Sequence, residues 1–291
     1  MMHGFLNIDK PAGLTSHDVV ARVRRAARQK RVGHAGTLDP AATGVLVVAL
    51  GAATRLIEYV QDATSKRYLA TVRLGASTAT DDGEGEVIAT APVPELRAAD
   101  LERALGGFRG EILQVPPMYA ALHHQGRRLH ELAREGIVVE RAARPVTIER
   151  LDLIGWSPPD LLIDVMCSKG TYIRALARDL GEAIGCGAFL QALRRTAVGS
   201  FAVEEATPLD LIEQQPAIIM SILHPPEQAV ADWPAVTLSE DEARRARNGQ
   251  ALALVGIVGD RARCHAPSGE LLALLRRSGD AWQPEKVFDW L

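Results

Sequence analysis

The chain has 291 residues, of which 47% are hydrophobic and 24% charged, and its formal net charge at pH 7 is −3. These proportions are typical of globular proteins and exclude a largely disordered chain. The length is sufficient for about two domains. Because the chain is slightly acidic overall, any nucleic-acid partner has to be bound by a local basic patch.

The three cysteines, Cys167, Cys186 and Cys264, are widely spaced and form no CxxC pair. This spacing suggests neither a zinc site nor a disulfide framework, and it fits a reducing compartment. The first residues lack the pattern of a secretory signal, and no apolar run approaches the ~20 residues of a membrane span. We therefore expect a cytoplasmic protein with no membrane association.

The first predicted elements are a short strand over residues 5–9 and a basic amphipathic helix. The strand ends at the turn Lys10-Pro11-Ala12-Gly13, and Thr15 with Asp18 forms a capping box that starts the helix. The apolar residues that follow have helical spacing, which places the basic residues on the opposite face. The basic residues of this segment are Arg22, Arg24, Arg25, Arg28, Lys30 and Arg31.

The segment GHAGTLDPAATG, residues 33–44, is a polar turn with one carboxylate, Asp39, and it leads directly into a buried strand over residues 45–50. An aspartate before proline is by default a turn former. Here small residues surround it, so the backbone can approach another molecule closely. His34 adds a polar ring to the same loop. A carboxylate buried there needs a partner, and Arg174 is a candidate.

Strand and helix patterns alternate through the middle of the chain. Residues 66–74 alternate as a half-buried strand that points Tyr68 toward the core, and residues 95–105 have a helical pattern. The segment 114–146 has a different composition and is predicted to extend outward from the core fold. Its basic residues are His123, His124, Arg127, Arg128, His130, Arg134, Arg141 and Arg144.

A second strand-to-helix junction follows. Residues 161–166 form a strand pattern, CSKGT forms a turn, and the next apolar residues share one helical face as far as Gly185. Tyr172 and Arg174 are therefore expected on the first turn of this helix.

Beyond residue 223 the composition is that of a linker, and the remainder is predicted to be a small β-rich module. Ser239 and Glu242 cap a short helix that ends at Gly249. Residues 251–258, 261–266 and 270–277 are expected to form short strands.

Four sequence blocks resemble, in the same order, the motifs of TruB-type bacterial tRNA pseudouridine synthases. They are GFLNIDKPAGLTSHDVV, RVGHAGTLDPAATGVLVVALGAATRL, KRYLATVRLG and SKGTYIRALARDLG. The resemblance extends over most of residues 4–201, and the C-terminal module resembles the PUA-type RNA-binding domain of the same family. It implies an α+β fold with a mixed, largely antiparallel sheet flanked by helices. The implied domains are a catalytic domain, 1–225, with an RNA-binding insertion at about 114–146, and a PUA-like domain, 233–291.

The resemblance also implies an activity, the conversion of uridine 55 in the T loop of tRNA to pseudouridine. In that family the aspartate of the GTLDP motif, here Asp39, is the essential catalytic group. Whether it attacks the base, attacks the ribose or first abstracts a ribose proton is left open by the sequence. Each route begins to break the C–N glycosidic bond with a carboxylate, and none requires a metal or an organic cofactor.

Further site residues follow from the same resemblance, position by position. The target base has to be flipped out of the RNA and stacked on a flat group, and Tyr68 matches the stacking tyrosine. Tyr172 matches a tyrosine proposed to help remove the C5 proton, and Arg174 matches the arginine that pairs with the aspartate. The remaining matches are Leu193, which lines the pocket, His34, which replaces the flipped base in the RNA stack, and Lys10, which buttresses the site.

Two other interpretations remain open from the sequence. A non-catalytic RNA-binding or RNA-folding protein would use the same basic surfaces, with Asp39 purely structural. A glycosidase or nucleoside hydrolase generally needs two carboxylates, and Asp81 is the nearest candidate for the second. For the first hypothesis we expect a monomer that binds the tRNA T stem-loop without an obligate protein partner.

Overall fold

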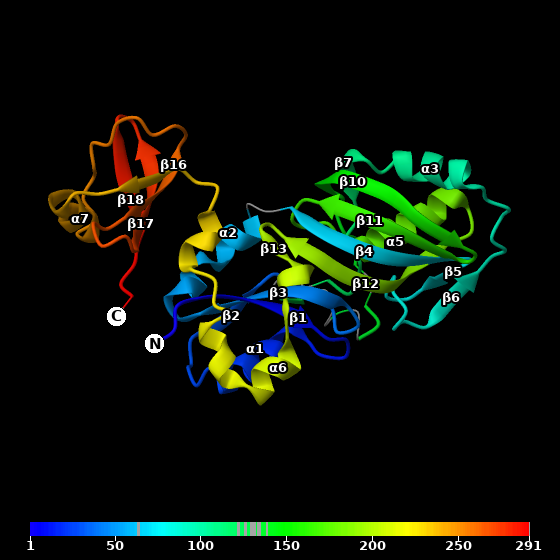
Figure 1. Cartoon of the computed structure of the whole chain (residues 1–291). Coiled ribbons are helices and arrows are strands. Elements are labelled where there is room, and N and C mark those ends of the chain that lie inside the picture. Colours follow the sequence, from blue (N-terminus) through cyan, green and yellow to red (C-terminus); the bar gives the residue numbers. More distant parts are fainter. Residues whose placement is uncertain are drawn as a thin grey trace.

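The computed structural model describes residues 1–62, 65–120, 123–124, 127–128, 132, 135–137 and 139–290. The molecule is elongated, with a large sheet and its helices at one end and a small β module at the other (Figure 1). None of the helices in these residues is long and apolar enough to cross a membrane.

The central sheet has ten strands. Its order is β14 (Thr207–Pro208), β1 (Gly4–Lys10), β3 (Thr43–Leu50), β12 (Ala188–Val198), β4 (Lys66–Leu74), β11 (Asp160–Cys167), β10 (Arg144–Ser157) and β7 (Gly110–Gln114), with β2 (Val32–Ala35) beside β3 and β13 (Phe201–Ala202) beside β12. Among the strand pairs that the described residues form in this sheet, only β1–β14 and β3–β12 are parallel. The expected mixed, largely antiparallel α+β fold is therefore confirmed.

Strand β3 lies deep in the fold because both of its faces are covered. Leu46, Val48 and Leu50 pack beneath helices α1 (Ser16–Ala26) and α6 (Leu209–Gln214). The alternate residues of the strand face a second cluster that includes residues of α2 (Ile57–Asp62). The continuous apolar run of the sequence reflects this two-sided burial. The predicted Thr15–Asp18 capping box is present at the start of α1.

The other half of the sheet is covered by α5 (Ile173–Ile184) and α3 (Ala98–Gly106), which pack on β4, β10 and β11. Helix α5 ends where predicted, because Gly185 adopts the left-handed conformation with φ 87°. Helix α3 begins three residues later than the predicted start at residue 95, because Arg97 takes the N-cap position and its N–H donates to Asp100. A two-stranded ladder, β5 (Ala76–Thr78) and β6 (Val87–Thr90), lies beyond this end of the sheet (Figure 1).

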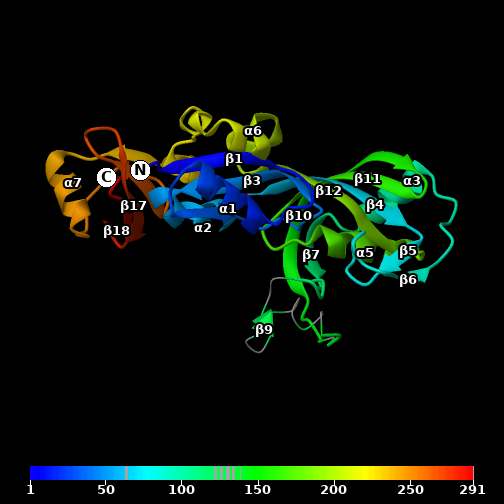
Figure 2. The same ribbon diagram turned by 90° about the horizontal axis from the view of Figure 1, so that it is seen from below.

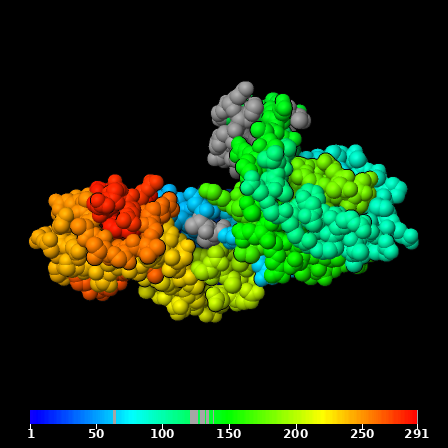
Figure 3. All heavy atoms as spheres, turned by 90° about the horizontal axis from the view of Figure 1, so that it is seen from above, coloured from blue at the N-terminus to red at the C-terminus, as the bar shows by residue number. Residues whose placement is uncertain are grey.

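The segment between β7 and β10 leaves the sheet, as the sequence predicts. It carries a short ladder of β8 (His123–His124) and β9 (Arg127–Arg128), and β9 lies well away from the sheet (Figure 2). The same segment forms part of a projection on the surface of the molecule (Figure 3). Two of its basic residues, His130 and Arg134, lie outside the described residues.

The C-terminal module contains a sheet in the order β15 (Ala235–Thr237), β16 (Arg261–His265), β17 (Leu271–Ser278) and β18 (Ala281–Val287), with helix α7 (Glu240–Arg247). The Ser239–Glu242 capping box is confirmed. The prediction of a strand over residues 251–258 is wrong, because this segment makes only an isolated bridge from Leu252 to Trp282. Gly256 has φ 78°, which breaks an extended run, and Val255 is exposed.

The segment with linker composition is packed rather than free. It forms the short 3₁₀ helix η4 (Pro226–Val230). The other 3₁₀ helices of the described residues lie before it in the chain: η1 (Gly51–Leu56), η2 (Val203–Glu205) and η3 (Pro216–Met220). Val230 and Trp233 are buried in one cluster with Phe5 of β1 and Leu274 of the C-terminal module. The division into domains 1–225 and 233–291 stays a prediction, with a shared apolar cluster at its boundary.

Candidate active site

The loop that carries Asp39 connects β2 to β3 and is supported from below by Lys10. This side chain, at the end of β1, is fully buried. Its ammonium donates hydrogen bonds to the carbonyl oxygens of Pro11 at 3.0 Å, Pro40 at 3.1 Å and Ala42 at 2.6 Å. Burial lowers the pKa of Lys10, and the charge of Asp39 opposes that shift. Lys10 therefore fixes the backbone on the C-terminal side of Asp39 and does not reach the surface.

Two further contacts fix the same loop. The Ser16 hydroxyl at the start of α1 accepts from the N–H of Leu38 at 2.8 Å and donates to the Leu38 carbonyl at 3.1 Å. At the other end, Gly44 has φ 97°, and a Cβ there would lie 2.2 Å from the carbonyl oxygen of Arg195. Only glycine fits this close approach of β3 to β12. The backbone on both sides of Asp39 is thus held before any substrate binds.

Asp39 and Arg174 meet although 135 residues separate them in the sequence (174 − 39). The Nε of Arg174 lies 3.1 Å from Oδ2 of Asp39. The Arg174 side chain is only 8% exposed, whereas that of Asp39 is 43% exposed. The remaining guanidinium nitrogens donate to the carbonyls of Thr80 at 3.3 Å and Tyr119 at 2.8 Å. The arginine is therefore fixed by protein groups, and the carboxylate is the partner with access to solvent.

A second carboxylate, Asp82, shares the same guanidinium. Its Oδ2 lies 3.4 Å from Nη1 of Arg174, and its Oδ1 accepts from the Thr80 hydroxyl at 2.5 Å. The sequence offered Asp81 only as the nearest second acid, and in the structure Asp81 pairs with Arg178 at 3.0 Å instead. Nothing in the sequence distinguishes these adjacent aspartates, because the turn that contains them decides which one faces Arg174.

The ionisation of Asp39 reflects these neighbours. Burial raises the pKa of Asp39 above its ordinary value, the charge of Arg174 lowers it, and the charge of Asp82 raises it. The net direction is upward. A carboxylate with a raised pKa is a stronger base and nucleophile than a fully solvated one, provided that the pH keeps it ionised.

Asp39 lies at the edge of a cavity of about 300 Å³, large enough for a single pyrimidine nucleoside. A smaller hollow of about 160 Å³ on the other side of Asp39 also reaches Arg174 and Asp82. The larger cavity is lined by Gly36, Thr37, Leu38, Asp39, Lys66, Tyr68, Tyr119, Ala120, Ser168, Gly170, Thr171, Tyr172, Ile173, Arg174, Leu193 and Arg195. Asp39, Tyr68, Tyr172, Arg174 and Leu193, five of the residues expected from the sequence, therefore meet in one cavity.

The two tyrosines reach the cavity from different elements. Tyr68 is on β4 and is 7% exposed, and burial raises its pKa. Tyr172 is the N-cap residue of α5, where the Gln114 side chain holds its backbone by accepting from the N–H at 2.8 Å and donating to the carbonyl at 3.2 Å. Burial also raises the pKa of Tyr172, and the charge of Arg174 opposes this. Both hydroxyls are therefore neutral at physiological pH and can donate hydrogen bonds.

The structure separates His34 from this cavity. We expected it in the same loop as Asp39, but it lies within strand β2, where it pairs with Val48 of β3. It is half-buried, and its buried Nδ1 has no hydrogen-bond partner among the described residues. Burial lowers the pKa of His34, so the ring is mostly neutral near pH 7.

Two basic residues of the cavity were not predicted from the sequence. Arg195 of β12 is 1% exposed, and its guanidinium donates to the carbonyls of Val45 at 2.7 Å and Gly36 at 3.1 Å. Lys66, the first residue of β4, lies on the same strand face as Tyr68. The two-residue spacing of Lys66 and Tyr68 on a predicted strand could have placed Lys66 on the same face as Tyr68. The position of Arg195 could not be predicted in this way, because it depends on the pairing of β12 with β4.

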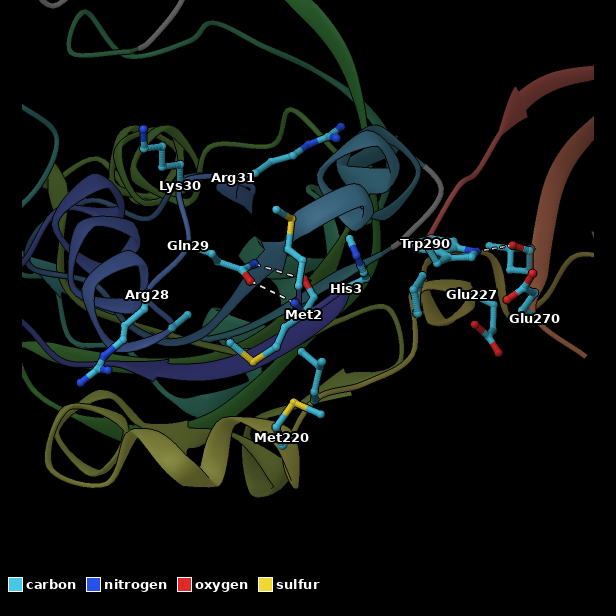
Figure 4. Close-up of a pocket in the computed structure, with 15 residues that line it drawn as sticks. Met2, His3, Arg28, Gln29, Lys30, Arg31, Met220, Glu227, Glu270 and Trp290 are labelled. Carbon is cyan, nitrogen blue, oxygen red and sulfur yellow. Dashed lines mark hydrogen bonds between the residues drawn. The ribbon is translucent and has the colours of Figure 1, made fainter. Parts of the chain in front are cut away.

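A larger hollow, of about 1,190 Å³, lies elsewhere. It is bounded by the N-terminal residues, the loop after α1, and the C-terminal module (Figure 4). Gln29 and Met2 exchange two hydrogen bonds of 3.1 Å across it, and the Trp290 indole donates to the Leu271 carbonyl. None of the predicted site residues lines it.

Similarity to proteins of known structure supports the assignment of the fold and the class. A chain in the crystal structure of a Cbf5-Nop10-Gar1 complex aligns with a TM-score of 0.76 and 27% sequence identity, covering 98% of this chain and 85% of that one. A chain in an archaeal box H/ACA sRNP Nop10-Cbf5 complex aligns with a TM-score of 0.73 and 27% identity, covering 98% and 86%.

Sequence relatives identify the family within this fold. A protein from Mycolicibacterium paratuberculosis named tRNA pseudouridine synthase B is 48% identical over 280 residues, 95% of this chain and 94% of its own. One of the same name from Syntrophomonas wolfei is 42% identical over 297 residues, 99% of each chain. Residues 24–173 match the model of the TruB family pseudouridylate synthase N-terminal domain. Residues 174–231 and 233–289 match those of the tRNA pseudouridylate synthase B C-terminal domain and of tRNA pseudouridine synthase II, C terminal.

The fold and the cavity are thus those of an enzyme that modifies RNA, a pseudouridine synthase. The chain belongs to the TruB family.

Proposed function

We propose that this enzyme isomerises uridine 55 in the T loop of tRNA, and that Asp39 starts the reaction. The observation that carries the proposal is the Asp39–Arg174 pair, 3.1 Å apart at the edge of a cavity of nucleoside size. The tRNA substrate is supported by the names of relatives that match nearly the whole chain. A purely structural role for Asp39 does not explain why the pair opens onto such a cavity.

The base has to leave the RNA stack to reach Asp39. A flipped pyrimidine that enters the 300 Å³ cavity meets the ring of Tyr68, and Leu193 of β12 supplies apolar contact. Base–aromatic stacking is worth about 1–3 kcal/mol, which offsets part of the cost of unstacking the base. The ribose then lies toward the rim, where Asp39 is accessible.

The ionised Asp39 is needed whether the first step is attack on the base, attack on the ribose or abstraction of a ribose proton. In each case the C1′–N1 bond breaks, the base turns within the cavity and C5 bonds to C1′, so no atoms are gained or lost overall. Arg174 keeps the carboxylate ionised and oriented. Tyr172 lines the cavity wall and is placed to assist removal of the C5 proton.

Binding of the RNA is assigned to three regions. His34, on β2 outside the cavity, fills the gap that the flipped base leaves in the RNA stack. The insertion of about residues 114–146 supplies basic groups for the phosphates, and the PUA-like module, residues 233–291, extends the contact. The protein works as a monomer in the cytoplasm, without an obligate protein partner.

The direct test uses a tRNA transcript labelled with tritium at C5 of its uridines. Pseudouridine formation at one position releases one label to water, and a transcript with cytidine at position 55 is the matched control. We expect release only from the transcript with uridine 55. Equal release from both transcripts would show another target position, and mapping of pseudouridine in cellular tRNA with and without the protein would identify it.

A further inference from the structure

Lys66 is a basic group in the cavity that has no role in the reaction proposed above. It is half-buried at the start of β4, and it lines the cavity together with Tyr68, two residues further along the same strand face. Within the part of the chain that the structure describes, its ammonium makes no hydrogen bond or ion pair. A partly buried cation without a partner is costly unless a ligand completes its contacts.

The neighbouring cation, Arg195, differs from Lys66 because its guanidinium has hydrogen-bond partners in the protein. Its three donor groups are used by the carbonyls of Val45, Thr37 and Gly36, at 2.7, 3.4 and 3.1 Å. A Cβ placed on Gly36 would lie 3.5 Å from Nη1 of Arg195 and 3.9 Å from Cε of Lys66. The two side chains therefore converge at Gly36 in the loop of Asp39. The guanidinium has protein acceptors there, whereas the ammonium of Lys66 has none among the described residues.

Lys66 and Asp39 lie toward opposite ends of the cavity. Asp39 also lines the smaller hollow together with Arg174 and Asp82, and Lys66 does not line that hollow. Tyr68 lines the larger cavity on the same strand face as Lys66, and it does not line the smaller hollow. A pyrimidine stacked on Tyr68 with its ribose at Asp39 therefore points its far edge toward Lys66. The atom opposite N1 in the ring is C4, which carries the O4 carbonyl.

We propose that Lys66 is a catalytic residue that donates a hydrogen bond to O4 of the flipped uracil and stabilises the negative charge that the ring gains. This inference rests on the proposed function. When the C1′–N1 bond breaks, its electron pair enters the ring and is shared by N1, O2 and O4; attack at C6 likewise places charge on O4. Lys66 keeps its proton throughout, and the charge leaves the ring when C5 forms its bond to C1′. The C5 proton is then lost, and N1, which lost its bond to C1′, gains a proton in its place.

The surroundings favour a base over a phosphate as the partner of Lys66. The cavity wall between Asp39 and Lys66 contains the ring of Tyr68 and the apolar side chain of Leu193. A phosphate there would lose its hydration against apolar groups with one ammonium as compensation. A fixed donor aimed at developing charge costs no reorganisation at the moment of reaction, and removal of one such donor typically slows a reaction by about 10²–10³-fold.

The test compares Lys66→Met, which keeps the length of the side chain and removes its charge, with Lys66→Arg and with wild type. Lys169→Met is the matched control, because Lys169 is an exposed lysine, paired with Asp62 at 3.2 Å, whose charge also acts on Lys66. Single-turnover rates at saturating enzyme and the Kd for a T-arm RNA are measured for each protein. A second RNA carries 5-fluorouridine at the target position, and its consumption is followed by nuclease digestion and mass spectrometry.

For Lys66→Met we expect a single-turnover rate on uridine about 10²-fold below wild type, with a Kd within about 3-fold. Lys66→Arg should keep part of the rate, and Lys169→Met nearly all of it. Fluorine withdraws electrons and stabilises the anionic ring, so the deficit of Lys66→Met should shrink at least several-fold on 5-fluorouridine.

Three results would overturn the proposal. The first is an unchanged rate of Lys66→Met. The second is a loss of its RNA affinity without a loss of rate, which a phosphate contact would give. The third is an equal deficit of Lys66→Met on uridine and on 5-fluorouridine, which a misfolded cavity would give. If the wild-type enzyme converts the uridine RNA in the same experiment, any of these results contradicts the role of Lys66 and leaves the proposed function standing. If the wild-type enzyme does not convert it, the proposed function itself fails.

Discussion

Replacing Arg174 with methionine removes the cation that Asp39 and Asp82 share. Nitrogen–oxygen distances of 3.1 and 3.4 Å correspond to attractions of about 5 kcal/mol each at an effective dielectric constant of ~20, before desolvation. Removing one partner of a buried pair costs about 3–5 kcal/mol, and the 43% exposure of the Asp39 side chain places this variant at the lower end. We expect Arg174→Met to lose about 3 kcal/mol of unfolding free energy near pH 7.

The pH dependence of this variant has a definite sign. Burial already raises the pKa of Asp39, and Arg174 opposes that rise, so the pKa of Asp39 in Arg174→Met should be higher still. The carboxylate is active only when ionised, so the acid limb of the rate profile should move to higher pH. Because the folded state then holds the proton more tightly than the unfolded chain, the loss of stability should lessen as the pH falls through the raised pKa.

The assay is the single-turnover rate of tritium release over a pH series, with urea unfolding at the same pH values. The matched control is Arg178→Met, one turn further along α5. Arg178 pairs with Asp81 at 3.0 Å, so this change removes an equally close ion pair that does not include Asp39. Arg178→Met should be destabilised without a shift of the acid limb. An unshifted acid limb in Arg174→Met, or equal shifts in both variants, would refute the role assigned to Arg174.

Three further predictions concern single side chains. Asp39→Asn should bind T-arm RNA with near wild-type affinity and release no tritium; normal release would remove Asp39 from the mechanism. Tyr68→Phe should keep most of the activity, whereas Tyr68→Leu should lose about 1–3 kcal/mol of base stacking, a 5- to 150-fold effect on the rate at limiting enzyme; equal effects of the two changes would argue against stacking. Lys10→Met leaves three carbonyls without their buried donor, so urea unfolding should show a loss of about 2–4 kcal/mol. If the unfolding free energy of Lys10→Met lies within about 0.5 kcal/mol of wild type, as for a typical surface substitution, Lys10 does not support the loop of Asp39 as described.

Local patterns in the sequence determine the elements that frame the site. The alternation of residues 66–74 predicts β4, and the capping box at Thr15 together with the apolar face before Gly185 predicts α1 and α5. These features depend on neighbours within a few residues, so they can be predicted without knowledge of the fold. The failure at residues 251–258 shows the limit: this apolar run reaches the edge of β18 at Leu252, but the positive φ of Gly256 ends the extended conformation.

The motifs likewise identify Asp39, Tyr68 and Arg174 one by one. Their meeting, and the identity of the residues around them, depends on the order of strands in the sheet. Arg195 reaches the loop of Asp39 because β12 lies between β3 and β4, and Asp82 rather than Asp81 faces Arg174 because of a turn beyond β4.

The sequence alone therefore predicted Asp39 as the catalytic acid and determined the class of fold, since both depend on contiguous motifs. Only the tertiary structure decided which charges surround that acid and that Lys66 has no partner among the described residues, because electrostatic energies depend on distances between atoms that the chain brings together from far apart.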